Sequence, residues 1–338
     1  QSFITQQPVE VGAAIVGPAV KGHVEITTLV TSYSEYVNKF GSTFVSGGQV
    51  YSFLTGNSAY NYFQNGGNTL LVTRVANGSF TSATASIAND TAQAFKLKTI
   101  SEGTIMNSDG TLGSDGQLST GTADNVRWEI SFADTGSGTF NLLIRQGNDL
   151  TNDKIVLETY AGISLDPFQD NYIAKVIGDQ NQTLVSDADG NKYLEITGSY
   201  ANKSNYVFVD EVLTPTPNFF NNTGSAASTA FEEAIPTVGS GSFGIATGNL
   251  LGTAPALFNE KIDTNTQGLV AADYSDAFSL LTNNDEYQYN VITAPGLIHG
   301  VSAHTGVLNT LISNTQNRGD AIAVIDLSKY GSTITSTT

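Results

Sequence analysis

A strand–helix–strand pattern near the carboxyl end constrains the fold of this chain more than any other feature. Residues 289–294 are mostly apolar and end at Pro295-Gly296, residues 299–317 have helical spacing, and residues 321–327 are apolar again. Two strands joined by one helix of this length form a parallel crossover, which we expect to be right-handed. Another helix is expected over residues 271–281. The carboxyl part of the chain is therefore predicted to fold as an α/β domain.

The first 78 residues predict a second α/β region. Thr31-Ser32 followed by Glu35 is a helix-start signal and Gly41 is a C-terminal cap, so a helix is expected over Tyr33–Phe40. A second helix is expected over residues 50–64 and should end at Asn65-Gly66-Gly67. Its candidate core residues are Phe53, Leu54, Tyr60 and Phe63. The expected strands cover residues 8–17, 25–30 and 69–76.

Between residues 79 and 213 the pattern changes to short alternating segments separated by turn residues. These segments predict a β-sandwich-like insertion with one short helix at residues 170–177. Residues 107–122 are rich in glycine and serine and are expected to form a mobile loop. Residues 214–244 are interpreted as a connector. The chain is thus predicted to be a mixed α/β (α+β) protein of three parts, which cover residues 1–78, 79–213 and 214–338.

Composition favours a protein that works against other protein surfaces. Charged residues make up 13% of the chain, about half of the usual share of roughly 25%. A polar, weakly charged surface suits contact with copies of the same chain, and the alternative is a secreted β-rich domain. The chain has no cysteine, which excludes disulfides and thiolate chemistry. No apolar run approaches the roughly 20 residues of a membrane helix, so stable membrane insertion is not expected.

The net charge of −17 is unevenly distributed along the chain. Residues 1–78 hold three acids and three bases, whereas residues 79–213 carry −10 and residues 214–338 carry −7. No basic patch is evident, so direct binding to nucleic acid is not expected. We expect the neutral first segment to pack against other surfaces and the acidic insertion to face outward, because its charges need water.

Several patterns formally match ligand sites, and each has a simpler interpretation. Residues 239–244 match G-x-G-x-x-G, but the flanking strand and helix of a dinucleotide site are missing, so a linker is expected. Residues 187–191 are spaced too closely for a calcium loop, and a hairpin turn between Leu184 and Tyr193 is expected instead. His299 and His304 lie five apart on one predicted helix and so on different faces, which predicts surface or cap histidines rather than a metal pair.

A serine hydrolase needs Ser, His and a carboxylate that converge. Asp326 ends the last predicted strand, but the sequence contains no G-x-S-x-G elbow. We therefore predict no catalytic, cofactor-binding or metal-binding residue and no enzymatic activity. Two alternatives stay open: an α/β hydrolase with an accessory β-sandwich, and a receptor-binding or adhesin module that uses the loops of the insertion.

Three stretches resemble one protein family, in the same order along the chain. The first has a Gly-Pro-x-x-x-Gly loop, a Phe-Gly after a helix, a Gly-Gly break and a strand ending in Arg-Val. The second has a Leu-Asp-Pro segment, and the third has Asp-Tyr-x-x-Ala, Pro-Gly-Leu and Gly-Asp-x-x-x-x-x-Asp. The matching positions are Gly17, Pro18, Gly22, Phe40, Gly41, Gly66, Gly67, Arg74, Asp166, Pro167, Asp273, Tyr274, Pro295, Gly296, Asp320 and Asp326. Together they resemble the sheath proteins of contractile phage-type tails.

The resemblance implies a structural subunit of the virion, assembled in the host cytoplasm, with a subtilisin-like (Rossmann-like) α/β domain that carries no protease activity. It implies stacked, hexameric rings of sheath subunits that polymerise helically around an inner tail tube and contract to deliver the genome through the host envelope. The implied partners are other sheath subunits, the tube, and baseplate and tail-terminator proteins, and no cofactor is implied.

One departure concerns the ends of the chain. Members of the family carry a further carboxy-terminal domain and extended arms, whereas this chain stops at GSTITSTT. Because the family's arms link neighbouring subunits, we expect this 338-residue form to be monomeric or weakly associated in solution.

Overall fold

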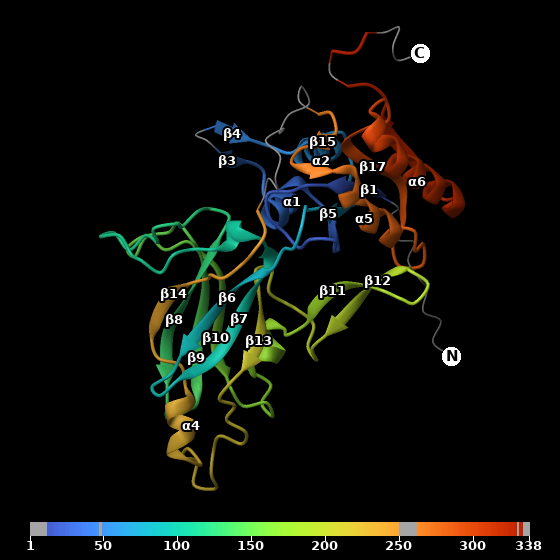
Figure 1. Ribbon diagram of the computed structural model, residues 1–338. Coiled ribbons are helices and arrows are strands. Elements are labelled where there is room, and N and C mark those ends of the chain that lie inside the picture. The colour runs from blue at the N-terminus through green and yellow to red at the C-terminus, as the bar shows by residue number, and fades with distance from the viewer. Residues whose placement is uncertain (1–11, 47–48, 250–261, 330, 334–338) are drawn as a thin grey trace, which may run out of the picture. The chain divides into compact units, whose positions relative to one another are not determined.

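The computed structural model describes residues 12–46, 49–249, 262–329 and 331–333 of a mixed α and β chain (Figure 1). The chain divides into two compact units. Unit 1 combines Gln1–Gly78, Leu184–Leu194 and Leu250–Thr338, and unit 2 combines Ser79–Thr183 and Glu195–Asn249. The two ends of the chain therefore fold together in unit 1, and each unit is described by itself.

Unit 1 is built on a five-stranded, mostly parallel sheet. In spatial order its strands are β18 (Ile322–Asp326), β17 (Tyr289–Ile298), β1 (Gly12–Gly17), β5 (Leu70–Arg74) and β2 (Thr27–Val30). β1 pairs in parallel with both β17 and β5, and β17 pairs in parallel with β18. Since helix α6 (Ser302–Arg318) joins β17 to β18, the parallel crossover predicted from the sequence is confirmed. The predicted strand at residues 8–17 is described from Gly12 onward, and its first four residues lie outside the described part.

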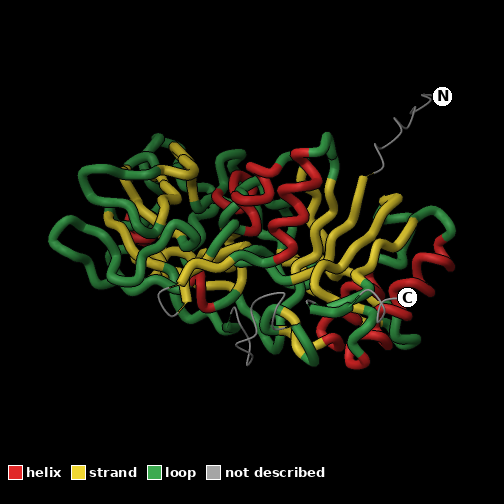
Figure 2. Tube along the Cα trace, turned by 90° about the horizontal axis from the view of Figure 1, so that it is seen from above, coloured by secondary structure: helices red, strands yellow, loops and turns green. Residues whose placement is uncertain are grey.

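Both faces of this sheet carry a hydrophobic core. Ala14 and Val16 of β1 pack with the short helices η3 (Ala271–Tyr274) and α5 (Ser275–Leu280) and with α6. Ile15, between them, packs on the other face with α1 (Tyr33–Phe40) and α2 (Leu54–Gln64). Successive side chains of a strand point to opposite faces. Helices therefore lie on both sides of the sheet, as in an α/β layer structure (Figure 2).

Helix α1 has the boundaries that the sequence predicts. The Ser32 hydroxyl accepts a hydrogen bond from the Glu35 amide, and the Glu35 carboxylate accepts one from the Thr31 amide. At the other end, Gly41 has a positive φ of 74° and its amide donates to Val37. The start and stop signals are both confirmed because they depend only on neighbouring residues.

Helix α2 begins four residues later than predicted, so the expected start at residue 50 is wrong. Val50 and Tyr51 lie in strand β4 (Gln49–Tyr51), which pairs with β3 (Phe44–Ser46). Phe44 and Phe53 stack with ring centroids 5.0 Å apart, and this contact keeps the preceding segment extended. Phe53 is buried as predicted, but Tyr60 is 46% exposed and is not a core residue.

The end of β17 also differs from the prediction. This strand runs through Pro295-Gly296 to Ile298 instead of stopping at residue 294. Its regular pairing ends at Thr293 and resumes only at Ile298, so the missing amide hydrogen of Pro295 disrupts no ladder bond. Helix α6 consequently starts at Ser302, and His299 lies outside it.

Unit 2 holds two antiparallel sheets around one core. The four-stranded sheet consists of β10 (Val156–Ser164), β9 (Thr139–Gln146), β8 (Val126–Asp134) and β14 (Gly239–Ser242). The three-stranded sheet consists of β13 (Val207–Val212), β7 (Gln93–Glu102) and β6 (Ser82–Ala88). Phe95 of β7 and Phe140 of β9 stack with centroids 5.6 Å apart, and both are fully buried. The shared core therefore lies between the two sheets. Residues of the short helices η1 (Thr104–Met106), α3 (Ile173–Ile177) and α4 (Thr229–Ala234) pack into it or against it.

Residues 214–244, interpreted from the sequence as a connector, carry α4 and β14. The G-x-G-x-x-G segment is therefore a strand paired with β8 rather than a linker. The absence of a side chain at Gly241 suits this pairing, because a Cβ there would lie 2.6 Å from the Trp128 ring. The hairpin predicted between Leu184 and Tyr193 is confirmed by β11 (Asn181–Ser186) and β12 (Lys192–Thr197), with the Asp187 carboxylate accepting the Asn191 amide.

Candidate functional site

Three of the family-type positions meet at one point of unit 1. The buried Arg74 guanidinium donates from Nη1 to the Gly22 carbonyl at 2.6 Å, and the Lys21 amide donates to the Phe40 carbonyl at 3.0 Å. Gly22 has a φ of 107°, and a Cβ there would lie 2.7 Å from the Phe40 ring. This Arg74 cluster (Gly22, Phe40, Arg74) fixes the loop after β1 against the end of α1. Its role is structural, because the Arg74 guanidinium and the Lys21 amide both donate to backbone carbonyls.

A second group of family-type positions meets at the carboxyl end of β17. The Asp326 carboxylate accepts the Gly296 amide at 3.4 Å. On the other side, Thr266 donates to the Gly296 carbonyl at 2.7 Å and Gln267 donates to the Pro295 carbonyl at 3.0 Å. The Pro295-Gly296 turn is thus held from both sides.

The sequence analysis missed Thr266 and Gln267, although both are completely buried. The side-chain Oε1 of Gln267 also accepts a hydrogen bond from the Leu54 amide at 2.7 Å. This amide is the first of α2. One glutamine therefore joins the start of α2 to the end of β17, which are more than 200 residues apart in sequence. No local pattern marks it, since a buried amide is recognised only from its partners.

The remaining family-type positions of unit 1 cap or support single elements. The Asp273 carboxylate accepts the Val270 amide at 2.9 Å and a hydrogen bond from Asn77 at 3.1 Å. Tyr274 is fully buried, and burial raises the pKa of its hydroxyl far above the ordinary value. Asp320 pairs with Arg318, whose guanidinium also donates to the Leu281 and Tyr287 carbonyls. None of these groups converges with the two clusters above.

The other positions are conformational or lie in unit 2. Gly41 and Gly66 have positive φ, whereas Gly67 leaves no room for a Cβ beside the Tyr62 ring. A Cβ on Gly17 would lie 2.3 Å from the Thr55 hydroxyl, and Pro18 is buried beside it. In unit 2, the buried Asp166 carboxylate accepts the Phe168 and Phe219 amides, and the Pro167 carbonyl accepts Lys175. The family-type positions therefore form separate backbone-holding contacts rather than one reactive site.

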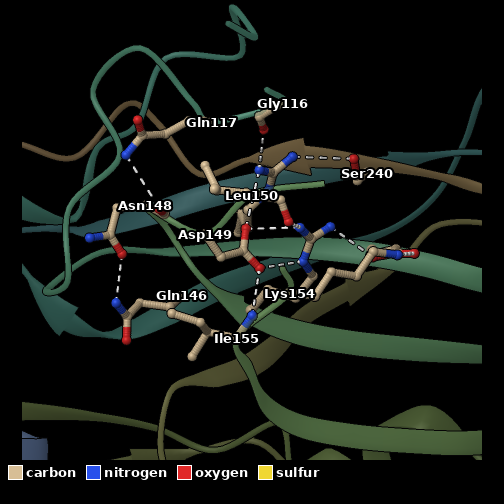
Figure 3. Close-up of polar contacts among 12 residues, drawn as sticks. Gly116, Gln117, Gln146, Asn148, Asp149, Leu150, Lys154, Ile155 and Ser240 are labelled. Atoms are coloured by element: carbon tan, nitrogen blue, oxygen red, sulfur yellow. Dashed lines mark hydrogen bonds and ion pairs between the residues drawn. The ribbon is translucent and has the colours of Figure 1, made fainter. Parts of the chain in front are cut away.

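A buried ionic cluster in unit 2 was not anticipated from the sequence (Figure 3). The Asp149 carboxylate accepts two hydrogen bonds from Arg145, at 2.7 and 2.8 Å, and one from Arg127 at 3.3 Å. The Ile155 amide donates to the same carboxylate at 3.1 Å. Arg127 also donates to the Gly116 carbonyl at 2.9 Å. Residues 107–122 are thereby attached to the loop around Asp149.

The two histidines named by the hydrolase alternative have different surroundings. His304 is fully buried rather than at the surface, and its Nδ1 accepts the Ile298 amide at 3.1 Å. That hydrogen bond leaves Nδ1 without a proton, and burial lowers the pKa of the ring, so a neutral imidazole is favoured. The His299 amide donates to the Asp326 carbonyl at 2.7 Å, and the His299 ring Nε2 lies 3.4 Å from Asn309 Oδ1. Within the described residues no cluster of three or more potential metal ligands occurs.

Strand β18 is an open edge of the sheet in unit 1. β17 is its only paired neighbour among the described strands. Ile322 and Val324 are 69% and 53% exposed on one face, whereas Ala323 and Ile325 pack on the other face into the core beneath α6. Parallel sheets are normally covered on both faces, and exposed edges are normally protected. The apolar, uncovered β18 is therefore the feature of unit 1 most suited to contact with another protein surface.

The opposite edge of the same sheet is protected. Strand β2 lies there, and Lys39 of α1 donates to the carbonyl of Leu29 in β2 at 3.3 Å. A lysine over an edge strand is a common way to prevent pairing with another chain. As far as the described residues show, only the β18 edge of this sheet is open.

Among the described residues, no helix combines the length and the apolar character needed to cross a bilayer.

Comparisons with known proteins give a likeness in shape alone. No family model and no curated protein matches the sequence. Among solved structures, a sheath tail protein from Listeria innocua aligns over 92% of this chain and 45% of its own, with 11% identity and a TM-score of 0.43. A sheath tail protein from Desulfitobacterium hafniense aligns over 94% of this chain and 49% of its own, with 11% identity and a TM-score of 0.37. The chain spans about half the length of both proteins, and at these scores the likeness establishes neither family nor function.

Proposed function

We propose that the chain is a structural subunit of a contractile phage-type tail sheath and that it acts by packing against copies of itself. The observation that carries the proposal is the open β18 edge with its exposed Ile322 and Val324. Burial of such an aliphatic side chain contributes about 1.5–3 kcal/mol, so this edge favours association with another chain. The type of assembly, a contractile tail sheath, is proposed from the ordered series of sequence motifs that resemble sheath proteins.

The contacts of the motif residues support a mechanical role. A subunit that passes between an extended and a contracted lattice transmits force through its body, so its internal loops need fixed positions. The Arg74 cluster and the Pro295-Gly296 turn hold the loops at the ends of β1 and β17 through hydrogen bonds of 2.6–3.4 Å. In the proposed mechanism, stacked rings surround an inner tube, and many modest interfaces rearrange together when the sheath contracts.

The proposal includes an orientation and a set of partners. Residues 1–78, which have no net charge, face the tube and the neighbouring subunits, and residues 79–213, with a net charge of −10, face outward. The subunit meets other sheath subunits in hexameric rings, the tube, and baseplate and tail-terminator proteins, in the virion after assembly in the host cytoplasm. Limited proteolysis of assembled particles tests the orientation: first cuts in residues 79–213 are expected, and first cuts in residues 1–78 contradict it.

The function itself is tested by electron microscopy of the complete gene product with its particle. Helical tubes around an inner tube, in a long and a short form, are expected. A gene product that never polymerises around a tube contradicts the proposal. Steady substrate turnover that is lost when His299, His304 or Asp326 is replaced by alanine would instead establish the hydrolase alternative.

A further inference from the structure

A small apolar projection stands on the surface of unit 1. The hairpin β3–β4 pairs Phe44 with Tyr51 and Val45 with Val50. Phe44 is buried against Phe53, so the Phe44 face of the hairpin points inward. Opposite residues of an antiparallel pair share a face, and adjacent residues alternate. The two valines therefore point outward together, and they are 71% and 67% exposed.

An apolar groove lies elsewhere on the same unit, on the α2 face of the sheet. Its volume is about 280 Å³, and it runs from Tyr62 of α2 across β1 and β17 to Val324 of β18. Val291 and Thr293 of β17 line it beside their pairing partners Ile322 and Val324. Helix α2 covers β1 on this face, but among the described residues nothing covers β18. The groove and the exposed residues of β18 form one continuous apolar surface, called the β18 groove below.

We propose that the β3–β4 hairpin of one copy docks into the β18 groove of a second copy, with Val45 and Val50 against Val324 and Ile322. The inference rests on the proposed function and assigns a specific surface to its subunit contact. The occupant is a second copy because the hairpin and the groove are both uncharged on a chain of net charge −17. Two such chains repel each other unless they meet through uncharged surfaces.

The sequence of β18 supports a covered state. Residues 322–325 are Ile-Ala-Val-Ile, and an unbroken apolar run is typical of parallel strands buried on both faces. The structure covers only the Ala323 and Ile325 face. A paired, exposed Val45–Val50 couple on a hairpin has no role in the core of its own unit. Within the described residues neither apolar surface has a partner, and each can cover the other.

The contact joins two different surfaces. Figure 1 shows hairpin β3–β4 on the opposite side of unit 1 from α6, the helix that packs on β17 and β18. In a head-to-tail arrangement such a contact is heterologous, and every added copy brings one free hairpin and one free groove. Repeated contacts of this kind form a ring when the rotation closes and a helical filament when it does not.

The absence of cysteine from the 338 residues allows a direct test by disulfide cross-linking of this chain. The Val45→Cys protein is mixed under mild oxidation with a Val324→Cys protein that carries a peptide tag. The tag separates the mixed dimer from the two homodimers in non-reducing electrophoresis, where it is quantified. The matched control is Val238→Cys, because Val238 is an equally exposed valine (65%) of unit 2. The expected yield of the Val45–Val324 dimer is about tenfold above that of the Val45–Val238 dimer, which corresponds to about 1.4 kcal/mol of site preference.

A second pair protects the test against poor disulfide geometry, since bridges form only when the Cα atoms lie within about 7 Å. Val50→Cys mixed with Ile322→Cys is expected to give the same excess. The double variant Val45→Cys/Val324→Cys is expected to give a ladder of linked copies. Equal yields with Val238→Cys for both pairs, or a predominance of Val45–Val45 dimers, overturn the docking mode.

The outcome is separable from that of the proposed function. If the complete gene product polymerises around a tube and does so equally well with Val45→Glu and Val324→Glu, the docking mode fails and the sheath function stands. If the wild-type gene product never polymerises, the sheath function fails whatever the cross-linking shows.

Discussion

The buried Asp149 carboxylate permits a sharp prediction about the stability of unit 2. Asp149→Asn keeps the shape of the side chain and removes its charge. The side chains of Asp149, Arg127 and Arg145 are 0%, 2% and 3% exposed, so water cannot replace the lost charge. Among the described residues, Glu129, which accepts Arg145 at 2.8 Å, is then the one carboxylate still bound to the two arginines.

The magnitude follows from leaving buried cations without compensation. Removal of one partner of a buried ion pair costs about 3–5 kcal/mol. Three hydrogen bonds from arginines and one from the Ile155 amide end on this carboxylate, so a value inside this range is expected for the loss of unfolding free energy. For a unit of this size that loss lowers the melting temperature by about 6–20 °C.

The chain offers a built-in probe for the measurement. Its single tryptophan, Trp128, lies in β8 next to Arg127, so the fluorescence of Trp128 follows the unfolding of unit 2 in urea. Lys154→Met is the matched control, because Lys154 is 38% exposed and bonds only to the rim of the cluster at Glu129. That replacement is expected to cost less than about 1 kcal/mol. A loss of less than 1 kcal/mol for Asp149→Asn, equal to that of the control, would refute the view that this cluster stabilises unit 2 by attaching residues 107–122 to the loop around Asp149.

Other predictions concern unit 1. Gly22→Ala places a Cβ 2.7 Å from the Phe40 ring at a φ of 107°, so calorimetry should show a loss of about 2–5 kcal/mol from backbone strain and overpacking together. Gly66 has a φ of 90° and no atom within 4 Å of a new Cβ. Gly66→Ala should therefore lose only the backbone part of the unfolding free energy, about 1–2 kcal/mol. Equal losses in the two variants would contradict the close packing of Gly22 against Phe40 in the Arg74 cluster. Burial lowers the pKa of His304 below its unfolded value of 6.5, so the unfolded state binds the proton more readily and unit 1 should lose stability as the pH falls below 6.5. Hydrogen exchange in α6 between pH 8 and pH 5 measures this (the ordinary histidine pKa lies between them), and a profile identical to that of His304→Gln would exclude His304 as the cause.

The sequence predicted those parts of the fold that depend on neighbouring residues. Ser32, Glu35 and Gly41 determine helix α1 through contacts within a few positions, and both ends were predicted correctly. The start of α2 was not, because Val50 and Tyr51 have helix-compatible spacing but pair across a hairpin with Phe44 and Val45. The position of a helix start was thus decided by a tertiary contact between Phe44 and Phe53.

The candidate site was predictable only in part for the same reason. Arg74, Pro295 and Asp326 were identified through motifs, but their roles came from partners distant in sequence. Gln267 bonds to Leu54 and Pro295, and Asp149 bonds to Arg127, across 213, 28 and 22 positions respectively. A buried polar residue resembles a surface residue in the sequence, and only its partners reveal that it is buried.

The two edges of the sheet in unit 1 favour an open assembly over a closed one. Lys39 covers the β2 edge by donating to the Leu29 carbonyl. No described residue protects the β18 edge in this way, and Ile322 and Val324 are exposed there. If β18 paired with the β18 of a second copy, the contact would be isologous and assembly would end at a dimer. Docking of hairpin β3–β4 into the β18 groove instead leaves both kinds of surface available at the two ends of the growing chain. The proposed sheath fits this second arrangement, because heterologous contacts generate rings when the rotation closes and helical filaments when it does not.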